Sequence, residues 1–284
     1  LPAGGQLSDS YLRELIRQLM EESRAVSVLN LKSILSVVET EKKSGIFDVQ
    51  IAAYLDNPLK SSYPYEDIAR EYLSQTFPSQ AELLGKTGIA KAAEEQAEQL
   101  MRMACYMSYT AYAARGPLLL VLEEKQMRQL YEDIELPLVY VLHDMEKEGI
   151  RVKREELARY GEKLQVRIEE LEKIIYDRAG EKFNINSPKQ LGVILFEKMG
   201  LPGGKKTKTG YSTAADVLEK LAPDHAIVSD ILEYRQLTKL KSTYADGLAG
   251  YIGEDGRIHS SLNQTITATG RISSTEPNLQ NIPI

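Results

Sequence analysis

The chain has 284 residues, of which 43% are hydrophobic and 27% charged, with a formal net charge of -6 and a pI near 5.4. This composition fits a globular protein with one or two cores and excludes disorder and collagen-like repeats. No apolar run approaches the roughly 20 residues that a membrane helix needs, and residues 1–8 lack the regions of a signal peptide. We therefore expect a cytoplasmic protein without a membrane partner.

The acidic balance excludes a protein that is basic throughout, but it does not exclude nucleic acid. Phosphate binding needs only a local group of Lys and Arg residues, and acidic residues elsewhere can outweigh their positive charge in the net charge of the chain. The single cysteine, Cys105, excludes an internal disulfide and has no cysteine neighbour for a zinc site. We expect it to be a buried apolar thiol.

The first part of the chain, residues 8–115, mixes short apolar segments such as 26–31 with helical stretches at 65–73 and 92–114. This mixture predicts an α/β layer. After Gly116 the pattern becomes almost purely helical. The change in pattern suggests a domain boundary at this point.

Two helices are predicted next. Apolar residues recur at helical spacing over 136–145, with Pro137 near the start and Gly149 after the end, as helix termini prefer. A second series over 157–175 predicts a helix of roughly 24 residues and about 36 Å, closed by Gly180. A rod of this length suits a projecting domain.

Capping signals mark the helices that follow. Ser187, followed by a proline, opens a helix that runs to Gly200. Ser212 and Thr213 are expected to cap another helix, with Asp216 as the capping-box partner of Thr213.

In the last part of the chain, the spacing of apolar residues changes from a helical pattern to a strand pattern. Residues 227–248 form one further amphipathic pattern and predict a long helix. A hairpin turn signal, Asp255 and Gly256, then precedes an expected strand over 257–267. Residues 269–284 are predicted to form a polar loop.

The C-terminal run 263–283 places amide and guanidinium donors on a strand and loop. Donors of this kind can bond the minor-groove acceptors shared by A·T and T·A pairs, and so sense the shape of a base pair without reading its sequence. By residue type alone, an Asn/Ser-rich surface turn is the alternative. As an ordered string, the run resembles the start of the palm of bacterial family A DNA polymerases. The resemblance implies DNA contacts from Gln264, Arg271, Asn278 and Asn281.

The resemblance extends upstream to residues 232–244, which look like the long thumb helix of that family. Arg235 and Lys239 are four residues apart, so they share a helix face and are expected to meet neighbouring phosphates. Segments 184–191 and 206–213 resemble the thumb tip, where helix starts, hydroxyls and lysines form phosphate sites. Alone, each segment fits an ordinary cap or a solvated lysine cluster. The candidate residues of these two segments are Asn186, Ser187, Lys206, Lys208, Ser212 and Thr213.

Residues 1–115 resemble, more weakly, the later portion of the family's proofreading exonuclease domain. Such an exonuclease holds two divalent metal ions with carboxylates, which activate water and stabilise the leaving oxygen. Ile34 stands at one expected aspartate position, four residues after Asn30, and Thr110 stands at another, four residues after Tyr106. The resemblance therefore implies a structural remnant without proofreading activity.

The polymerase chemistry of the family also lies elsewhere. Its carboxylates follow the segment that 263–283 resembles and hold magnesium ions, while a fingers helix receives the nucleotide. We therefore expect no catalytic residue, no metal ligand and no bound cofactor in this chain. His143 with Asp144 is predicted to lie on a solvated helix face. His225 and His259 lack partners at metal-ligand spacing.

The predicted fold is α+β and mostly α: an exonuclease-like remnant (1–115), a helical thumb (116–256) and the start of a palm (257–284). The resemblance implies part of a DNA-directed DNA polymerase that binds primer–template duplex through the thumb and the first palm strand. Its implied partners are this duplex, deoxynucleoside triphosphates, and the remaining palm and fingers on the same or a second chain. The complete enzyme would use magnesium.

Three other functions compete with this interpretation. One is a non-catalytic DNA-binding scaffold, completed by a second chain or independent of it. A metal-dependent exonuclease is disfavoured by the missing aspartates. A helical protein-interaction module accounts for the amphipathic helices but not for the ordered C-terminal run.

Overall fold

A computed structural model describes residues 8–40, 42–204, 206–207 and 210–282. Its contacts divide the chain into two units. Unit 1 comprises residues 1–149 with 260–281, and unit 2 comprises 150–259 with 282–284. The expected boundaries were 115/116 and 256/257. The first boundary differs because α8 (Arg115–Glu124) and α10 (Leu136–Glu148) bury Leu118, Leu122 and Val139, which lie beyond it, in the core of unit 1.

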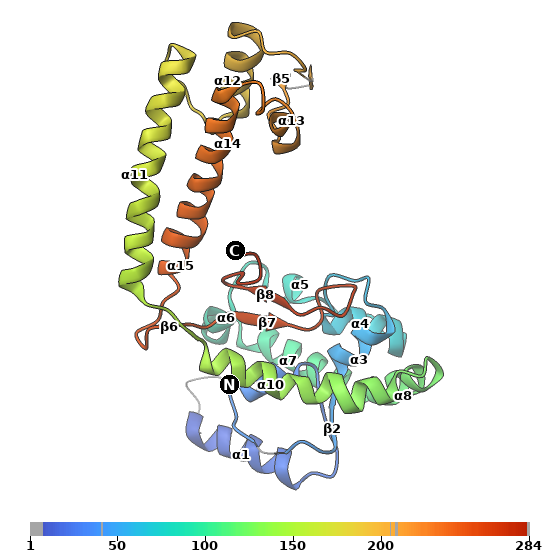
Figure 1. The fold of residues 1–284 in the computed structure, drawn as a ribbon. Coiled ribbons are helices and arrows are strands. Elements are labelled where there is room, and N and C mark those ends of the chain that lie inside the picture. The colour runs from blue at the N-terminus through green and yellow to red at the C-terminus, as the bar shows by residue number, and fades with distance from the viewer. Residues whose placement is uncertain (1–7, 41, 205, 208–209, 283–284) are drawn as a thin grey trace. The chain divides into compact units, whose positions relative to one another are not determined.

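Unit 1 is mainly helical (Figure 1). Its helices before residue 114 are α1 (Asp9–Glu22), α2 (Leu31–Leu35), α3 (Val49–Asp56), α4 (Tyr65–Leu73), α5 (Gln80–Leu84), α6 (Ile89–Glu95) and α7 (Ala97–Ala113). They are followed by α8 (Arg115–Glu124), α9 (Arg128–Leu130), the π-helix η1 (Tyr131–Glu135) and α10 (Leu136–Glu148). Its strands are β1 (Val26–Val28), β2 (Ile46–Asp48), β7 (Ser261–Asn263) and β8 (Ser273–Thr275).

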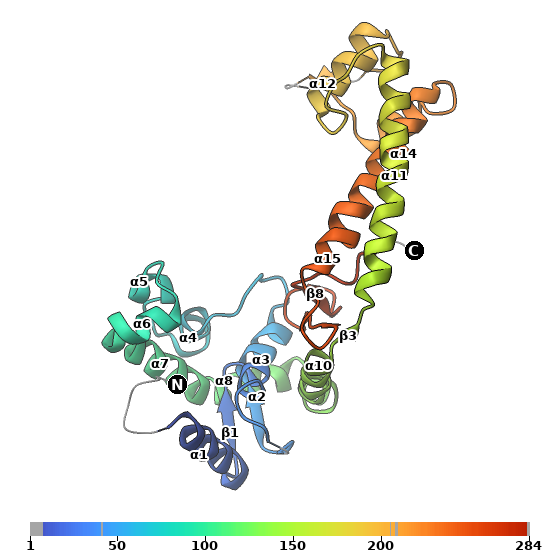
Figure 2. The same ribbon diagram turned by 90° about the vertical axis from the view of Figure 1, so that its left-hand side faces the viewer.

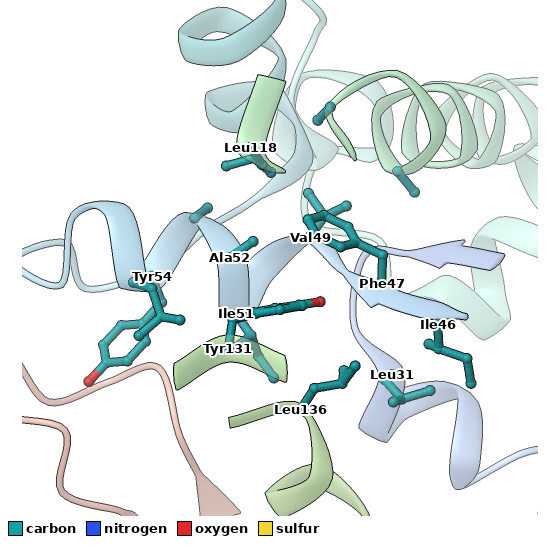
Figure 3. Packing of buried hydrophobic residues seen from close by; sticks show 14 of the residues in the cluster. Leu31, Ile46, Phe47, Val49, Ile51, Ala52, Tyr54, Leu118, Tyr131 and Leu136 are labelled. Carbon is teal, nitrogen blue, oxygen red and sulfur yellow. The ribbon is translucent and has the colours of Figure 1, made fainter. Parts of the chain in front are cut away.

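The core of unit 1 forms around β2 and α3. Strands β1 and β2 pair in parallel, with Val26 opposite Ile46. The side chains of β2 and α3 are almost all buried, since every residue of this segment except Asp48, Gln50 and Asp56 is apolar. Leu31, Tyr131 and Leu136 pack against them from α2, η1 and α10 (Figure 3). The predicted α/β character of this region is thus limited to one short two-stranded sheet.

Unit 2 is built on α11 (Arg154–Ala179) and α14 (Ala226–Lys239), which run side by side in opposite directions (Figures 1 and 2). Buried residues of α11, including Leu171 and Ile175, meet Ile227 and Ile231 of α14. Its other helices are α12 (Pro188–Gly192), α13 (Ala215–Glu219) and α15 (Gly247–Ala249), with the π-helices η2 (Val193–Lys198) and η3 (Leu240–Asp246). Its strands are β3 (Ile150–Arg151), β4 (Lys206–Thr207), β5 (Gly210–Tyr211) and β6 (Arg257–Ile258).

The predicted class, α+β and mostly α, is confirmed, but several local predictions are wrong. The strand expected over 257–267 consists of two short strands, because β6 pairs with β3 whereas β7 pairs with β8. The loop expected over 269–284 contains β8. The helix expected over 92–114 breaks at Gln96, whose φ of -138° and ψ of 41° are not helical. Cys105 is exposed rather than buried, since it lies on the outer side of α7.

In the part of the chain that the structure describes, no helix is both long and apolar enough to cross a bilayer.

Candidate nucleic-acid interface

The first predicted segment, around Asn186 and Ser187, lies where the chain enters α12. Ser187 is the N-cap residue, and its Oγ accepts a hydrogen bond from the N–H of Gln190 at 3.4 Å. Pro188 takes the first helical position, as expected. Asn186 is exposed, and its N–H donates to the Oδ1 of Asn184 at 3.0 Å. The predicted cap is present, while a phosphate contact here stays a prediction.

The second predicted segment, Ser212 and Thr213, directly precedes the N-cap residue of α13. Its capping differs from that of α12. The N-cap residue is Ala214, which makes no side-chain cap hydrogen bond, so the predicted capping box between Thr213 and Asp216 is wrong. The Oγ of Ser212 instead accepts from the N–H of Ala214 at 3.5 Å. Thr213 is buried, and its carbonyl and hydroxyl oxygens both accept hydrogen bonds from Arg235.

Arg235, on α14, donates hydrogen bonds to residues at both predicted segments, the one around Asn186 and the one around Ser212. Its guanidinium donates to the carbonyl oxygen of Thr213 at 2.7 Å, to the Thr213 Oγ1 at 3.3 Å and to the carbonyl oxygen of Ile185 at 3.4 Å. The side chain is half-buried, and this burial lowers the pKa of the guanidinium. Ile185 directly precedes Asn186, and Thr213 directly follows Ser212. The predicted phosphate contact of Arg235 therefore competes with a positioning role.

The lysines of the predicted interface lie in different settings. Lys239 is the last residue of α14 and is exposed. It follows Arg235 by one turn of the same helix, which is the arrangement expected from their spacing. Lys206 belongs to β4, whose side chains are not described, and Lys208 lies outside the described residues.

Gln264 is the first predicted minor-groove contact, and it is turned into unit 1. Only 9% of the residue is exposed, and its Nε2 donates to the carbonyl oxygen and to the Oε2 of Glu135, each at 3.0 Å. Its amide donors are thus engaged by η1. The minor-groove role of Gln264 stays a prediction that requires these bonds to open.

Arg271, by contrast, is exposed. Its guanidinium forms no ion pair with Glu276, the carboxylate five residues further along; both residues lie in the described part of the chain. Its carbonyl oxygen accepts a hydrogen bond from the Oγ1 of Thr267 at 2.6 Å, which fixes the backbone of the turn. Asn278 and Asn281 are also exposed, and the Oδ1 of Asn278 accepts from a neighbouring backbone N–H.

A cleft of about 900 Å³ lies in the part of unit 1 that was expected to be exonuclease-like. Asn30, Ser33 and Ile34 contribute to its lining from the loop before α2 and from α2 itself. Glu66 is the only carboxylate among the described lining residues, which is fewer than a two-metal site requires. Thr110 is fully buried, and its Oγ1 has no hydrogen-bond partner among the described residues.

Potential metal ligands are dispersed elsewhere as well. Apart from residues 1–7, 41, 205, 208–209 and 283–284, which are not described, no three His, Cys, Asp or Glu side chains gather to hold a metal ion. His259 is paired with Asp255 at 3.0 Å. The described residues therefore do not fit a magnesium site.

Asp48 is a buried carboxylate that sequence analysis missed. Its Oδ2 accepts from the N–H of Leu31 at 2.6 Å and its Oδ1 accepts from the N–H of Ile51 at 3.0 Å, so one side chain bonds the first turns of α2 and α3. Burial raises its pKa to about 6, although the backbone N–H groups oppose the shift. The hydroxyl of Tyr131 accepts from the Asp48 N–H at 2.7 Å. An Asp directly before an apolar helix was the available signal.

Comparisons with known proteins identify the class. Residues 154–284 match the sequence model of DNA polymerase family A. Two similar curated relatives are the DNA polymerase I of Bacillus subtilis (strain 168), 45% identical over 267 residues, and that of Geobacillus stearothermophilus, 41% identical over 271 residues. Each alignment covers 94% of this chain, but the chain spans only 29% and 30% of the respective relatives.

A solved structure gives the same result for the fold. The POL domain of Pol1 from M. smegmatis, in complex with DNA primer-template and dNTP, matches with a TM-score of 0.71 and 33% identity. The match covers 89% of this chain and 40% of that one.

Proposed function

We propose that this chain is the part of a cytoplasmic DNA-directed DNA polymerase that grips primer–template duplex. The observation that carries the proposal is the match, over 89% of the chain, to a polymerase domain solved with DNA primer-template and dNTP. The ordered family motifs in both units support the polymerase over an independent DNA-binding scaffold. No finding favours that scaffold specifically.

The proposed contacts fall into two groups. In unit 2, exposed Asn186 and Lys239 and the hydroxyls of Ser187 and Ser212 meet backbone phosphates, which positions the duplex without reading its sequence. In unit 1, the contacts come from the C-terminal segment, and Arg271 supplies a planar donor toward the minor groove. The remaining proposed contacts are Lys206, Lys208, Thr213, Gln264, Asn278 and Asn281. For Arg235, we propose a positioning role through Thr213 and Ile185 in place of the expected phosphate contact.

The complete polymerase would add deoxynucleotides to a primer, with magnesium held by residues of the remaining palm. Since the described residues of this chain do not fit a metal site, we assign it no step through the ion. Its exonuclease-like cleft carries Ile34 where a metal-binding aspartate is expected, so we propose that it has no proofreading activity.

Duplex binding by this chain tests the proposal. Fluorescence anisotropy with labelled primer–template duplexes of unrelated sequence should give similar affinities that fall steeply with salt. Lys239→Ala should reduce the salt slope by about one, as expected for one lost phosphate contact. Lys163→Ala removes the same charge from an exposed position on α11 and should leave the slope unchanged. Absence of salt-dependent duplex binding would contradict the proposal.

A further inference from the structure

Strand β7 has one edge paired by another strand and one edge contacted by side chains. Leu262 lies opposite Ser274 of β8. Its own N–H donates to the Oε1 of Glu146 at 2.5 Å, and its carbonyl oxygen accepts from the Nζ of Lys32 at 2.5 Å. In an antiparallel ladder, the backbone groups of successive residues alternate between the two edges. Lys32 and Glu146 therefore supply a donor and an acceptor at the second edge, as a neighbouring strand would.

The two side chains also bond each other. The Nζ of Lys32 lies 2.6 Å from the Oε1 of Glu146, and the side chains are only 21% and 20% exposed. Lys32 comes from α2, and Glu146 comes from α10. The start of α2 is fixed in turn, because its first N–H is bonded by the buried carboxylate of Asp48.

Two more contacts hold the chain beyond β7 to the same unit. Gln264 bonds to Glu135 of η1, and the carbonyl oxygen of Thr267 accepts from the hydroxyl of Tyr54 at 2.8 Å. Tyr54 lies on α3 with its hydroxyl directed toward the C-terminal segment, drawn in faint red (Figure 3). Thr267 then bonds to the carbonyl oxygen of Arg271. A continuous series of hydrogen bonds thus links the exonuclease-like core to the turn that carries Arg271.

We propose that Lys32 and Glu146 are positioning residues that set the register of β7, and thereby place the loop that presents Arg271. The register matters because a shift of one residue turns every side chain of a strand to the opposite face. The exonuclease-like region would then act as the platform of the palm strands. The effect on DNA rests on the proposed function, whereas the register does not.

Hydrogen exchange of the β7 and β8 amides in this chain tests the register directly. Lys32→Met keeps the length of the side chain but removes the donor, and should raise exchange at Leu262 about tenfold. Lys147→Met is the matched control, because it breaks an exposed pair with Glu39, 66% and 84% exposed, and should change nothing at Leu262. Lys32→Arg retains a donor and should restore protection.

A charge-swapped pair separates positioning from simple ion pairing. Lys32→Glu combined with Glu146→Lys preserves the ion pair but faces the Leu262 N–H with a donor and its carbonyl oxygen with an acceptor. If the pair only adds stability, the swap keeps Leu262 protected, which would overturn the proposal. If it sets the register, the swapped chain exchanges as fast as Lys32→Met.

The consequence for DNA is measured in a polymerase completed with the remaining palm and fingers. Lys32→Met should slow single-turnover primer extension at least about tenfold more than it weakens duplex binding, since alignment is lost. Fast exchange at Leu262 with unchanged extension would overturn the positioning role. A wild-type chain that shows protected Leu262 but binds no duplex would refute the proposed function alone.

Discussion

Replacing Arg235 by Ala is expected to destabilise unit 2 before it affects any phosphate contact. Hydrogen bonds from charged groups contribute about 1.5–3 kcal/mol each. Of the three bonds made by the guanidinium, only that to the carbonyl oxygen of Thr213, at 2.7 Å, is short, and the side chain is half-buried. We expect the short bond to contribute its full strength and the two longer bonds to contribute little. Arg235→Ala should therefore lower the free energy of unfolding by about 2–3 kcal/mol.

Thermal unfolding and salt-dependent duplex binding together distinguish the two roles of Arg235. Arg159→Ala is the control, since it removes the same charge from a side chain of α11 that is 69% exposed. If Arg235 positions the two segments, its variant unfolds at a lower temperature than the control and binds duplex more weakly with an unchanged salt slope. A variant as stable as the control, with a slope reduced by about one, would refute this reasoning.

Two further predictions concern unit 1 and a glycine turn. Because burial raises the pKa of Asp48 to about 6, its contribution to stability is fully present below its unfolded value near 3.8 and is lost as the pH rises through 6. The unfolding free energy relative to Asp48→Asn, from urea titrations between pH 4 and 7, should fall by up to about 3 kcal/mol, and a flat difference would contradict this. Gly45→Ala should cost more than Gly256→Ala in thermal unfolding: both have positive φ, but only at Gly45 would a Cβ lie 2.4 Å from the Arg24 carbonyl oxygen. Equal losses would be inconsistent with that contact.

Local chemistry made some features predictable. Ser187 was recognised as a cap because a hydroxyl directly before a proline satisfies the free N–H groups of the first turn, which depends on neighbouring residues alone. The long helix α11 followed from its apolar period and the closing Gly180. Both signals are contained within a few turns of chain.

Features that depend on distant partners were not predictable. The spacing of Arg235 gives its helix face, but not that carbonyl oxygens 22 and 50 residues away would accept its hydrogen bonds. Similarly, the strand pattern over 257–267 does not reveal that the segment before Ser260 pairs with β3 whereas the segment after it pairs with β8. The hydrogen bonds that join Leu262 to Lys32 and to Glu146 span 230 and 116 residues of sequence. Tertiary contacts of this kind leave no periodic signal.

The central claim, that this chain holds and aligns a primer–template in a polymerase, is tested most directly at Arg271. This residue is exposed, forms no ion pair with Glu276, and stands on a turn fixed by Thr267. In the completed polymerase, we predict that Arg271→Ala lowers the single-turnover extension rate on matched primers far more than it weakens duplex binding, because the primer end is no longer aligned. Unchanged extension, with only a small loss of thermal stability, would contradict the account.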